Sequence, residues 1–215
     1  MPAATLIPTI VNNQENLYEG NLRYYFRLVF NSPNAQLPYH NFRHMTGVLC
    51  QTYLAARFYK ERLDSKTRRA LFIAAIFYDF GHSANASDDE KEVDLAISLF
   101  KQNILEEDKL FLPEIERLIR ATQWPHVEME ADLAVQIIRD ADLAQSFSDV
   151  WIQQIVFGLA AENKVSPLEM LKQQRNFFLG FKFNTDWAKK QFGGQVLADK
   201  LQEVADLLDI LESGD

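Results

Sequence analysis

The segment ALFIAAIFYDFGH, residues 70–82, decides the fold class of this 215-residue chain. Its first eight residues are apolar without a break, and Asp64 or Ser65 offers a helix N-cap shortly before them. A run of this length predicts a helix over residues 66–79 that is buried on most of its sides. Such a helix needs other helices packed around it, so the segment places the chain in the all-α class.

Helical spacing of apolar residues continues on both sides of this segment. It predicts helices over residues 15–30, 41–63, 66–79, 89–104, 108–122, 128–139, 146–162, 166–180 and 186–212. Residues 1–14, with prolines at positions 2 and 8, are expected to be an irregular lead-in to one helical domain over 15–215. The sequence has no strongly alternating β pattern and no internal repeat. We therefore predict an all-α protein, a single compact helical bundle of about nine helices.

Charge and composition restrict the partners and the location of the protein. The net charge is −8 and the pI about 5.1, whereas nucleic-acid surfaces rely on clustered Lys and Arg, so no nucleic-acid partner is expected. No apolar stretch reaches the roughly 20 residues of a membrane span, and the N-terminus lacks the pattern of a signal peptide. The single cysteine, Cys50, stands among apolar residues and is expected in the core. We expect a cytoplasmic protein that has a small-molecule partner and does not bind membranes.

Histidines and aspartates gather in four short segments of the sequence. The segments are PYHNFRH (38–44), YDFGH (78–82), TQWPH (122–126) and RDADLA (139–144). A carboxylate at the end of an apolar helix, as at Asp79, is costly unless a cation or a hydrogen-bond donor pairs with it. Imidazole and carboxylate donors suit divalent Zn, Fe, Mn or Mg. An ion with open positions lowers the pKa of bound water, and the hydroxide attacks phosphorus while a histidine protonates the leaving oxygen.

Several of these acidic and aromatic residues have competing interpretations. Asp79 is alternatively a helix-end residue paired with Arg43 or Arg69, and Asp140 competes with Asp142 for the functional role. The acidic run over 88–92 is expected to be the solvated start of a helix. The aromatic residues between positions 177 and 187 are expected to form core or the contact of a homodimer.

In their order along the chain, the four segments resemble the HD-domain superfamily of metal-dependent phosphohydrolases, which includes the cyclic-nucleotide phosphodiesterases. PYHNFRHMTGVL resembles the first family segment, and AAIFYDFGHSAN resembles the His-Asp segment. IRATQWPH and RDADLAQ resemble the third and last segments, and RNFFLGFKF is similar to the C-terminal helices of bacterial members. The resemblance spans about residues 20–210 and implies an α-helical bundle of the phosphodiesterase type.

The resemblance implies a metal centre. His44, Asp79 and Asp142 would be the ligands of a divalent ion (Mn, Mg, Zn or Fe). Asp79 would also bridge two ions if two are bound, and the resemblance places it among the catalytic residues as well. The chain departs from the family at Tyr78, where the family has a histidine that binds the metal directly.

The resemblance also implies catalytic and substrate-binding residues. His40 would be the general acid toward the leaving oxygen, and His82 would line the site as a second catalytic histidine. His126, Asn41 and Gln123 would bind the substrate or its phosphate. The expected function is hydrolysis of a phosphate mono- or diester, with a nucleotide or a related small molecule as substrate.

Tyr78 leaves three hypotheses open. A neutral phenol with a pKa near 10 is a poor ligand for Mg or Zn. In the first hypothesis the site therefore holds its metal more weakly, and water or His82 occupies the ligand position that Tyr78 leaves unfilled. Alternatively the site uses iron or manganese with Tyr78 as an unusual ligand. In the third hypothesis the chain is a degenerate HD-domain protein that binds a small ligand or a partner without catalysis.

Overall fold

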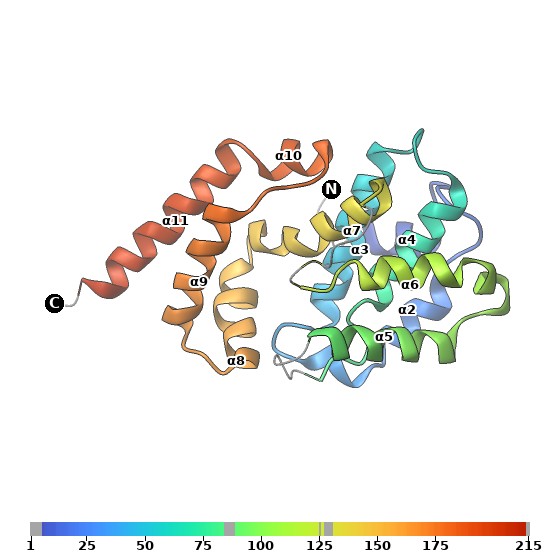
Figure 1. Ribbon diagram of the computed structural model, residues 1–215, viewed down its shortest axis with the longest axis horizontal. Helices are drawn as coiled ribbons and strands as arrows, with labels where there is room; N and C mark the ends of the chain where they lie inside the picture. Colours follow the sequence, from blue (N-terminus) through green and yellow to red (C-terminus); the bar gives the residue numbers. More distant parts are fainter. Residues whose placement is uncertain (1–5, 84–88, 125, 127–130, 214–215) are drawn as a thin grey trace.

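The computed structural model describes residues 6–83, 89–124, 126 and 131–213, and within these ranges it is helical and contains no strand (Figure 1). The α-helices are α1 (Leu6–Val11), α2 (Arg23–Phe30), α3 (Phe42–Phe58), α4 (Ser65–Phe77), α5 (Asp89–Asn103), α6 (Leu112–Arg120), α7 (Leu133–Leu143), α8 (Ala160–Asn163), α9 (Pro167–Gly180), α10 (Asp186–Phe192) and α11 (Gln195–Glu212). A π-helix covers Ile152–Leu159. None of the described helices combines the length and the apolar character needed to span a membrane. The all-α prediction is confirmed.

The described ranges contain eleven α-helices, and two differences explain the departure from the predicted nine. The lead-in over 1–14 is not wholly irregular, because it contains α1, whose apolar face is buried against the core. The expected helix over 186–212 is divided into α10 and α11 at Gly193 and Gly194. Gly194 has a φ of 57°, in the left-handed region that favours glycine, and this ends the helical path.

The first predicted helix, over 15–30, begins only at Arg23. The side chain of Asn13 occupies the backbone groups that such a helix would need. Its Oδ1 accepts a hydrogen bond from Leu17 N at 2.9 Å, and its Nδ2 donates to Gly20 O at 3.2 Å. Local side-chain bonds of this kind compete with helical hydrogen bonds, so the chain turns here instead.

Helix α4 is buried as its apolar sequence predicts. Every residue from Arg69 to Phe77 is buried, and the helix contacts α2, α3, α5, α6 and α7. Asp64 is the N-cap, and its carboxylate accepts a hydrogen bond from Thr67 N at 2.7 Å. Helices α1 to α7, over residues 6–143, surround this element and share one large apolar core that includes Cys50. We call them the N-terminal body.

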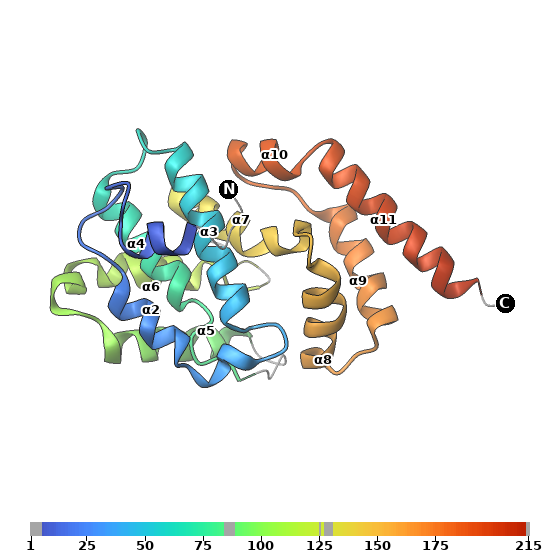
Figure 2. The same cartoon turned by 180° about the vertical axis from the view of Figure 1, so that it is seen from behind.

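A second group of helices covers one end of the N-terminal body (Figures 1 and 2). We define the C-terminal layer as residues 151–180 and 195–212, which contain the π-helix, α8, α9 and α11. This layer has a small apolar core of its own, which consists of Trp151, Val156, Leu171, Phe178, Val204 and Leu208. Helix α11 runs outward from α10 to the C-terminus (Figure 1). The body therefore has one large core, and the layer has this small core and a second small cluster of Ile155, Ala160 and Met170.

Candidate functional site

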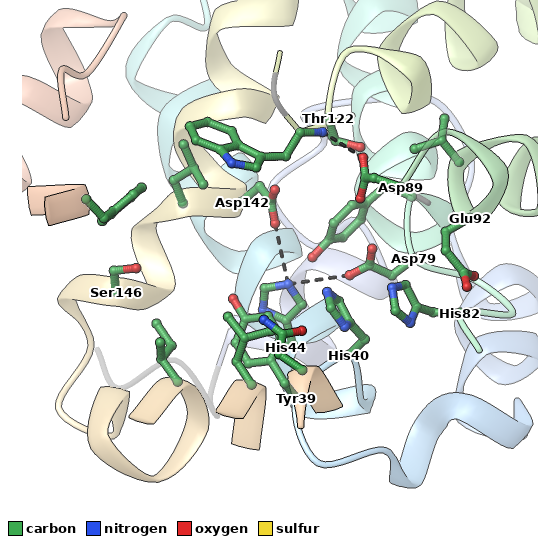
Figure 3. Close-up of a pocket in the computed structure, with 18 of the residues that line it drawn as sticks. Tyr39, His40, His44, Asp79, His82, Asp89, Glu92, Thr122, Asp142 and Ser146 are labelled. Carbon is green, nitrogen blue, oxygen red and sulfur yellow. Dashed lines mark hydrogen bonds and ion pairs between the residues drawn. The ribbon is translucent and has the colours of Figure 1, made fainter. Parts of the chain in front are cut away.

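A cavity of about 320 Å³ lies where the N-terminal body meets the C-terminal layer (Figure 3). The body contributes the start of α3, the end of α4 and the end of α7. The C-terminal layer closes the opposite wall with Ile155, Leu159, Asn163, Gln174 and Phe177. All four segments singled out in the sequence line this cavity, and the segment over 122–126 contributes Thr122 and Trp124.

The three predicted metal ligands meet in the wall of this cavity. His44 Nε2 lies 3.4 Å from Asp79 Oδ2 and 3.4 Å from Asp142 Oδ1 (Figure 3). His44 stands in the first turn of α3, where the Asn41 side chain accepts hydrogen bonds from Arg43 N and His44 N. The His44 imidazole is 1% exposed, so burial holds it against both carboxylates. The structure therefore brings together three residues from segments that are distant in the sequence.

Arg69 and Asp140, two residues of the competing interpretations, have other partners in the structure. Arg69 binds Asp108, with 2.6 Å between Arg69 Nε and Asp108 Oδ1, rather than Asp79. Asp140 accepts hydrogen bonds from Thr185 N, Thr185 Oγ1 and the backbone and side chain of Asn184. Asp140 thus fixes the segment before α10, and Asp142 is the aspartate of that pair that faces the cavity.

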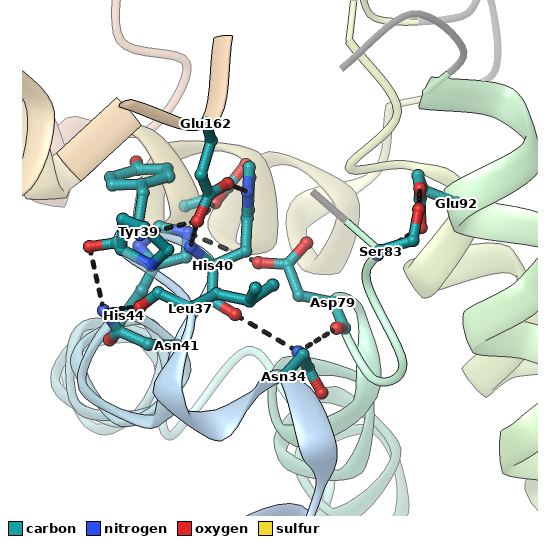
Figure 4. A network of polar contacts seen from close by, with 12 residues as sticks. Asn34, Leu37, Tyr39, His40, Asn41, His44, Asp79, Ser83, Glu92 and Glu162 are labelled. Carbon is teal, nitrogen blue, oxygen red and sulfur yellow. Dashed lines mark hydrogen bonds and ion pairs between the residues drawn. The ribbon is translucent and has the colours of Figure 1, made fainter. Parts of the chain in front are cut away.

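Asn34 joins the two segments that carry the histidines. Its amide nitrogen donates to His40 O at 3.2 Å and to Asp79 O at 2.8 Å (Figure 4). Its amide oxygen accepts a hydrogen bond from Gly81 N at 3.2 Å, where the backbone has a φ of 85°. Because Asn34 is buried, these bonds hold the loop before α3 and the turn after α4 in a constant relation.

Glu162, from the last turn of α8, also binds the loop before α3 (Figure 4). Its Oε1 accepts hydrogen bonds from Tyr39 N at 2.6 Å and from His40 N at 3.0 Å. Its Oε2 lies 2.6 Å from His40 Nδ1. The Glu162 side chain is 2% exposed, so a carboxylate from the C-terminal layer is buried against a histidine of the body.

The second histidine of the cavity wall stacks on the first. The rings of His40 and His82 are 3.8 Å apart between centroids and inclined by 20° (Figure 3). Within the described ranges, His40, His82 and Glu162 are the group whose ligand atoms all lie within 4.8 Å of one another. His44, Asp79 and Asp142 are joined only through His44 and do not form such a compact group.

The charges around His40 favour an ion pair with Glu162. Burial alone lowers the pKa of His40, but the carboxylates of Asp79 and Glu162 outweigh burial and raise that pKa above its usual value. Burial raises the pKa of Glu162, yet the hydrogen bond and charge of His40 lower it overall. Burial and the neighbouring charge of His40 lower the pKa of His82. A proton on this stacked pair is therefore favoured on His40 over His82.

Tyr78 lies beside the predicted metal ligands and is buried. Its ring centroid is 5.8 Å from that of His44, and its hydroxyl has no hydrogen-bond partner among the described residues. Burial, and then the negative charges of Asp79 and Asp142, raise the pKa of Tyr78 well above its usual value. A phenol in this position stays neutral, so it does not supply the anionic oxygen that a hard cation prefers.

The acidic run at the start of α5 reaches the cavity instead of being wholly solvated. Asp89 and Glu92 both line it, and Asp89 Oδ2 accepts a hydrogen bond from Trp124 N at 2.6 Å. Burial, and next the charges of Asp79 and Asp142, raise the pKa of Asp89 against that hydrogen bond. Asp88 lies outside the described residues. The lining includes these carboxylates and, within the described ranges, neither Lys nor Arg.

The three residues expected to bind substrate lie elsewhere. Asn41 does not line the cavity, because its side chain is used as the N-cap of α3 and donates to Leu37 O at 2.9 Å. Gln123 is also absent from the lining. His126 lines an adjoining cavity with Phe177 and Lys182, next to Trp124, whose ring centroid is 4.9 Å away. The structure thus places Asn41 and Gln123 outside the cavity lining and His126 in the adjoining cavity.

Glu162 is the site residue that sequence analysis missed. It follows the apolar stretch IVFGLAA, and a lone acid at the end of such a stretch is the signal that pointed to Asp79. No spacing in the sequence relates Glu162 to His40, which lies far earlier in the chain. No protein-family model, curated protein or solved structure matches this chain.

Proposed function

We propose that the protein hydrolyses a phosphate mono- or diester with the help of a divalent ion. The observation that carries the proposal is the approach of Asp79 and Asp142 to within 3.4 Å of the same nitrogen, His44 Nε2, in a cavity wall. Two ligand atoms at about 2.1 Å from a tetrahedral zinc ion lie about 3.4 Å apart, so these contacts have the size of ligand pairs. His44 Nδ1 and Asp79 Oδ2 are buried and have no hydrogen-bond partner among the described residues.

The charge of the cavity supports the need for a cation. Four acidic residues line it, Asp79, Asp89, Glu92 and Asp142. The described part of the lining contains no Lys or Arg. A phosphate ester is an anion, and these carboxylates would repel it. A divalent ion reverses the local charge, polarises a phosphoryl oxygen and lowers the pKa of a nearby water.

The remaining residues of the cavity match the needs of the substrate. His40, held by Glu162, faces the cavity and is the proposed proton donor to the leaving oxygen. The rings of Trp124 and Phe177, 6.4 Å apart, offer an apolar surface to a planar group. The amide oxygen of Gln174 is buried without a partner in the described residues and can accept a hydrogen bond from a ligand N–H. A nucleotide has the matching groups, which are a leaving oxygen, a planar base and N–H donors.

This proposal includes membership of the HD-domain superfamily, with Tyr78 as a departure from it. It rests on the order of the four sequence segments and on the convergence of His44, Asp79 and Asp142. A neutral Tyr78 in the place of a histidine ligand predicts a weakly held ion. Replacing Tyr78 with histidine is then expected to raise metal affinity by about 10-fold or more, as expected when a ligand is added.

The test is an assay of purified protein with phosphomonoesters, phosphodiesters and a nucleotide panel, each with Mn, Mg, Zn or Fe. We expect turnover with at least one metal and a loss of about 100-fold or more in Asp79→Asn and Asp142→Asn. Asp149→Asn is the matched control, because Asp149 is an exposed aspartate that does not line the cavity. Turnover by the Asp79→Asn protein at the wild-type rate would contradict the proposal.

The charge pattern also favours a second candidate, a protein that binds an organic cation without catalysis. Carboxylates together with the aromatic rings of Tyr39, Trp124 and Phe177 form a surface suited to an amine. In this case polyamines raise the melting temperature of metal-free protein, whereas phosphate esters do not. Equal stabilisation by amines and by neutral analogues of the same shape would exclude this candidate.

A further inference from the structure

We propose that His40, His82 and Glu162 form a binding site for a divalent transition-metal ion, separate from the group of His44, Asp79 and Asp142. The three side chains come from the loop before α3, the turn after α4 and the end of α8. Their ligand atoms all lie within 4.8 Å of one another, and His40 and His82 line the cavity from which an ion would enter. No spacing in the sequence relates these three residues, because Glu162 lies far from both histidines along the chain.

The donor types match a small set of metals. Two imidazoles and one carboxylate bind Zn and Fe in three-residue sites that keep positions open for other ligands. Donors of one ion are at most about 4.2 Å apart, twice a ligand distance of about 2.1 Å. Ligand atoms spread over 4.8 Å reach that spacing by small side-chain rotations. The expected ion is therefore Zn or Fe rather than Mg or Ca, which prefer oxygen donors.

Glu162 is oriented before any ion binds. Tyr39 N and His40 N donate to its Oε1, at 2.6 and 3.0 Å, and these bonds leave Oε2 directed at His40 (Figure 4). Partners of this kind fix the direction of a ligand and strengthen metal binding. Gly158, one turn before Glu162, lets the π-helix approach the same loop, since an added Cβ would lie 2.6 Å from Pro38 O.

The comparison with the other group favours this site for the first ion. Its ligand atoms are mutually close, whereas Asp79 and Asp142 are connected only through His44. The other group also has the neutral Tyr78 where a further ligand was expected. Two nitrogen donors bind Zn more strongly than one nitrogen with oxygens, in line with the preferences of borderline metals.

An ion at this site and the proton on His40 compete for the same carboxylate. His40 Nδ1 and Glu162 Oε2, 2.6 Å apart, share a hydrogen bond that an ion bound by both groups would replace. The inference does not rest on the proposed hydrolysis, because it concerns binding alone. It predicts that saturation of this site inhibits any turnover that uses His40 as the proton donor.

The two groups differ in their number of imidazoles, and this makes them distinguishable. Protein loaded with one equivalent of Cu²⁺ is studied by pulsed electron paramagnetic resonance, which counts the histidines bound to copper. We expect two imidazoles in the wild type, one in His82→Gln, and two in His44→Gln. A single imidazole that disappears in His44→Gln would overturn the proposal and assign the ion to the other group.

Zinc affinity is the second measurement, made by competition with a chromogenic chelator. Loss of a direct ligand in Glu162→Gln or His82→Gln is expected to weaken zinc binding by more than about 100-fold, since loss of an outer partner alone costs about 10–100-fold. His126→Gln removes a histidine outside the group and is the matched control, with unchanged affinity. His82 lies in a turn rather than in the core, so we expect the His82→Gln protein to keep its fold. A change in its zinc affinity then reports the loss of the ligand. Wild-type affinity in His82→Gln would overturn the proposal.

Discussion

The central helix of the N-terminal body and the last helix of the C-terminal layer differ sharply in burial. Nine of the 13 residues of α4 are buried, whereas α11 buries two of its 18, Val204 and Leu208. Apolar burial is the main source of stability, so the body is expected to be the resistant part and the layer the part that opens at lower free energy. The cavity lies between them, and the layer lines it with residues such as Leu159 and Gln174 and binds His40 of the cavity wall through Glu162. The shape of the site therefore depends on the less stable partner.

The largest effect is expected from the buried ion pair of the body. Arg69 and Asp108 are 4% and 0% exposed, and Tyr25 also donates to Asp108 at 2.8 Å. Arg69→Met leaves a buried carboxylate without its cation and is expected to reduce the free energy of unfolding by about 3–5 kcal/mol. Urea denaturation measures this loss. The double variant with Asp108→Leu is expected to regain part of it, and a double variant as unstable as the single one would contradict the charge argument.

A smaller and local effect is expected in the C-terminal layer. Leu208→Ala removes part of a core of six residues, at a cost of about 2–3 kcal/mol for a side chain near the edge of its core. Hydrogen exchange is the measurement, with faster exchange in α9 and α11 and unchanged exchange in α4. Equal acceleration in α4 and α11 would show that body and layer unfold as one unit and would remove the contrast between them.

The contact between the two regions is tested at Gly158. Gly158→Ala places a Cβ about 2.6 Å from Pro38 O, which forces the π-helix away from the loop before α3. Overpacking of this kind costs about 1–3 kcal/mol. We expect a loss of zinc affinity together with a modest loss of stability, because Glu162 moves with the π-helix. Gly180→Ala is the control, since nothing lies within 4 Å of an added Cβ there. Unchanged zinc affinity in Gly158→Ala would show that this contact does not position Glu162 for zinc binding.

The smallest effect is expected at the N-cap of α4. Hydrogen bonds from the Thr67 backbone and side chain lower the pKa of Asp64. The cap therefore stabilises the protein above the unfolded-state pKa of about 4 and is lost as the pH falls through the lower folded-state value. Asp64→Ala is expected to cost about 1 kcal/mol at pH 7. Asp64→Asn keeps a cap without charge, so its thermal stability is expected to lack this acid dependence.

Much of the fold was predictable from short-range physics. The apolar run of α4 required burial, and Asn41 and Asp64 marked helix starts because their side chains satisfy free backbone N–H groups. Asp79 and Asp142 stood out for a related reason, since carboxylates beside apolar segments need partners, whereas His44 was named as a ligand through the family resemblance. The division between α10 and α11 was missed, although Gly193 and Gly194 stand in the sequence, because helical spacing continues on both sides of them.

The sequence by itself determined that the chain is helical, where most helices begin, and which segments bring histidine and aspartate to one place. Only the tertiary structure decided that Glu162 meets His40, that Asp140 serves the fold while Asp142 faces the cavity, and that Asn41 caps a helix instead of lining the site. The reason is physical. Helix formation and capping depend on neighbours within a few residues, whereas the partner of a buried charge is chosen by the packing of distant segments.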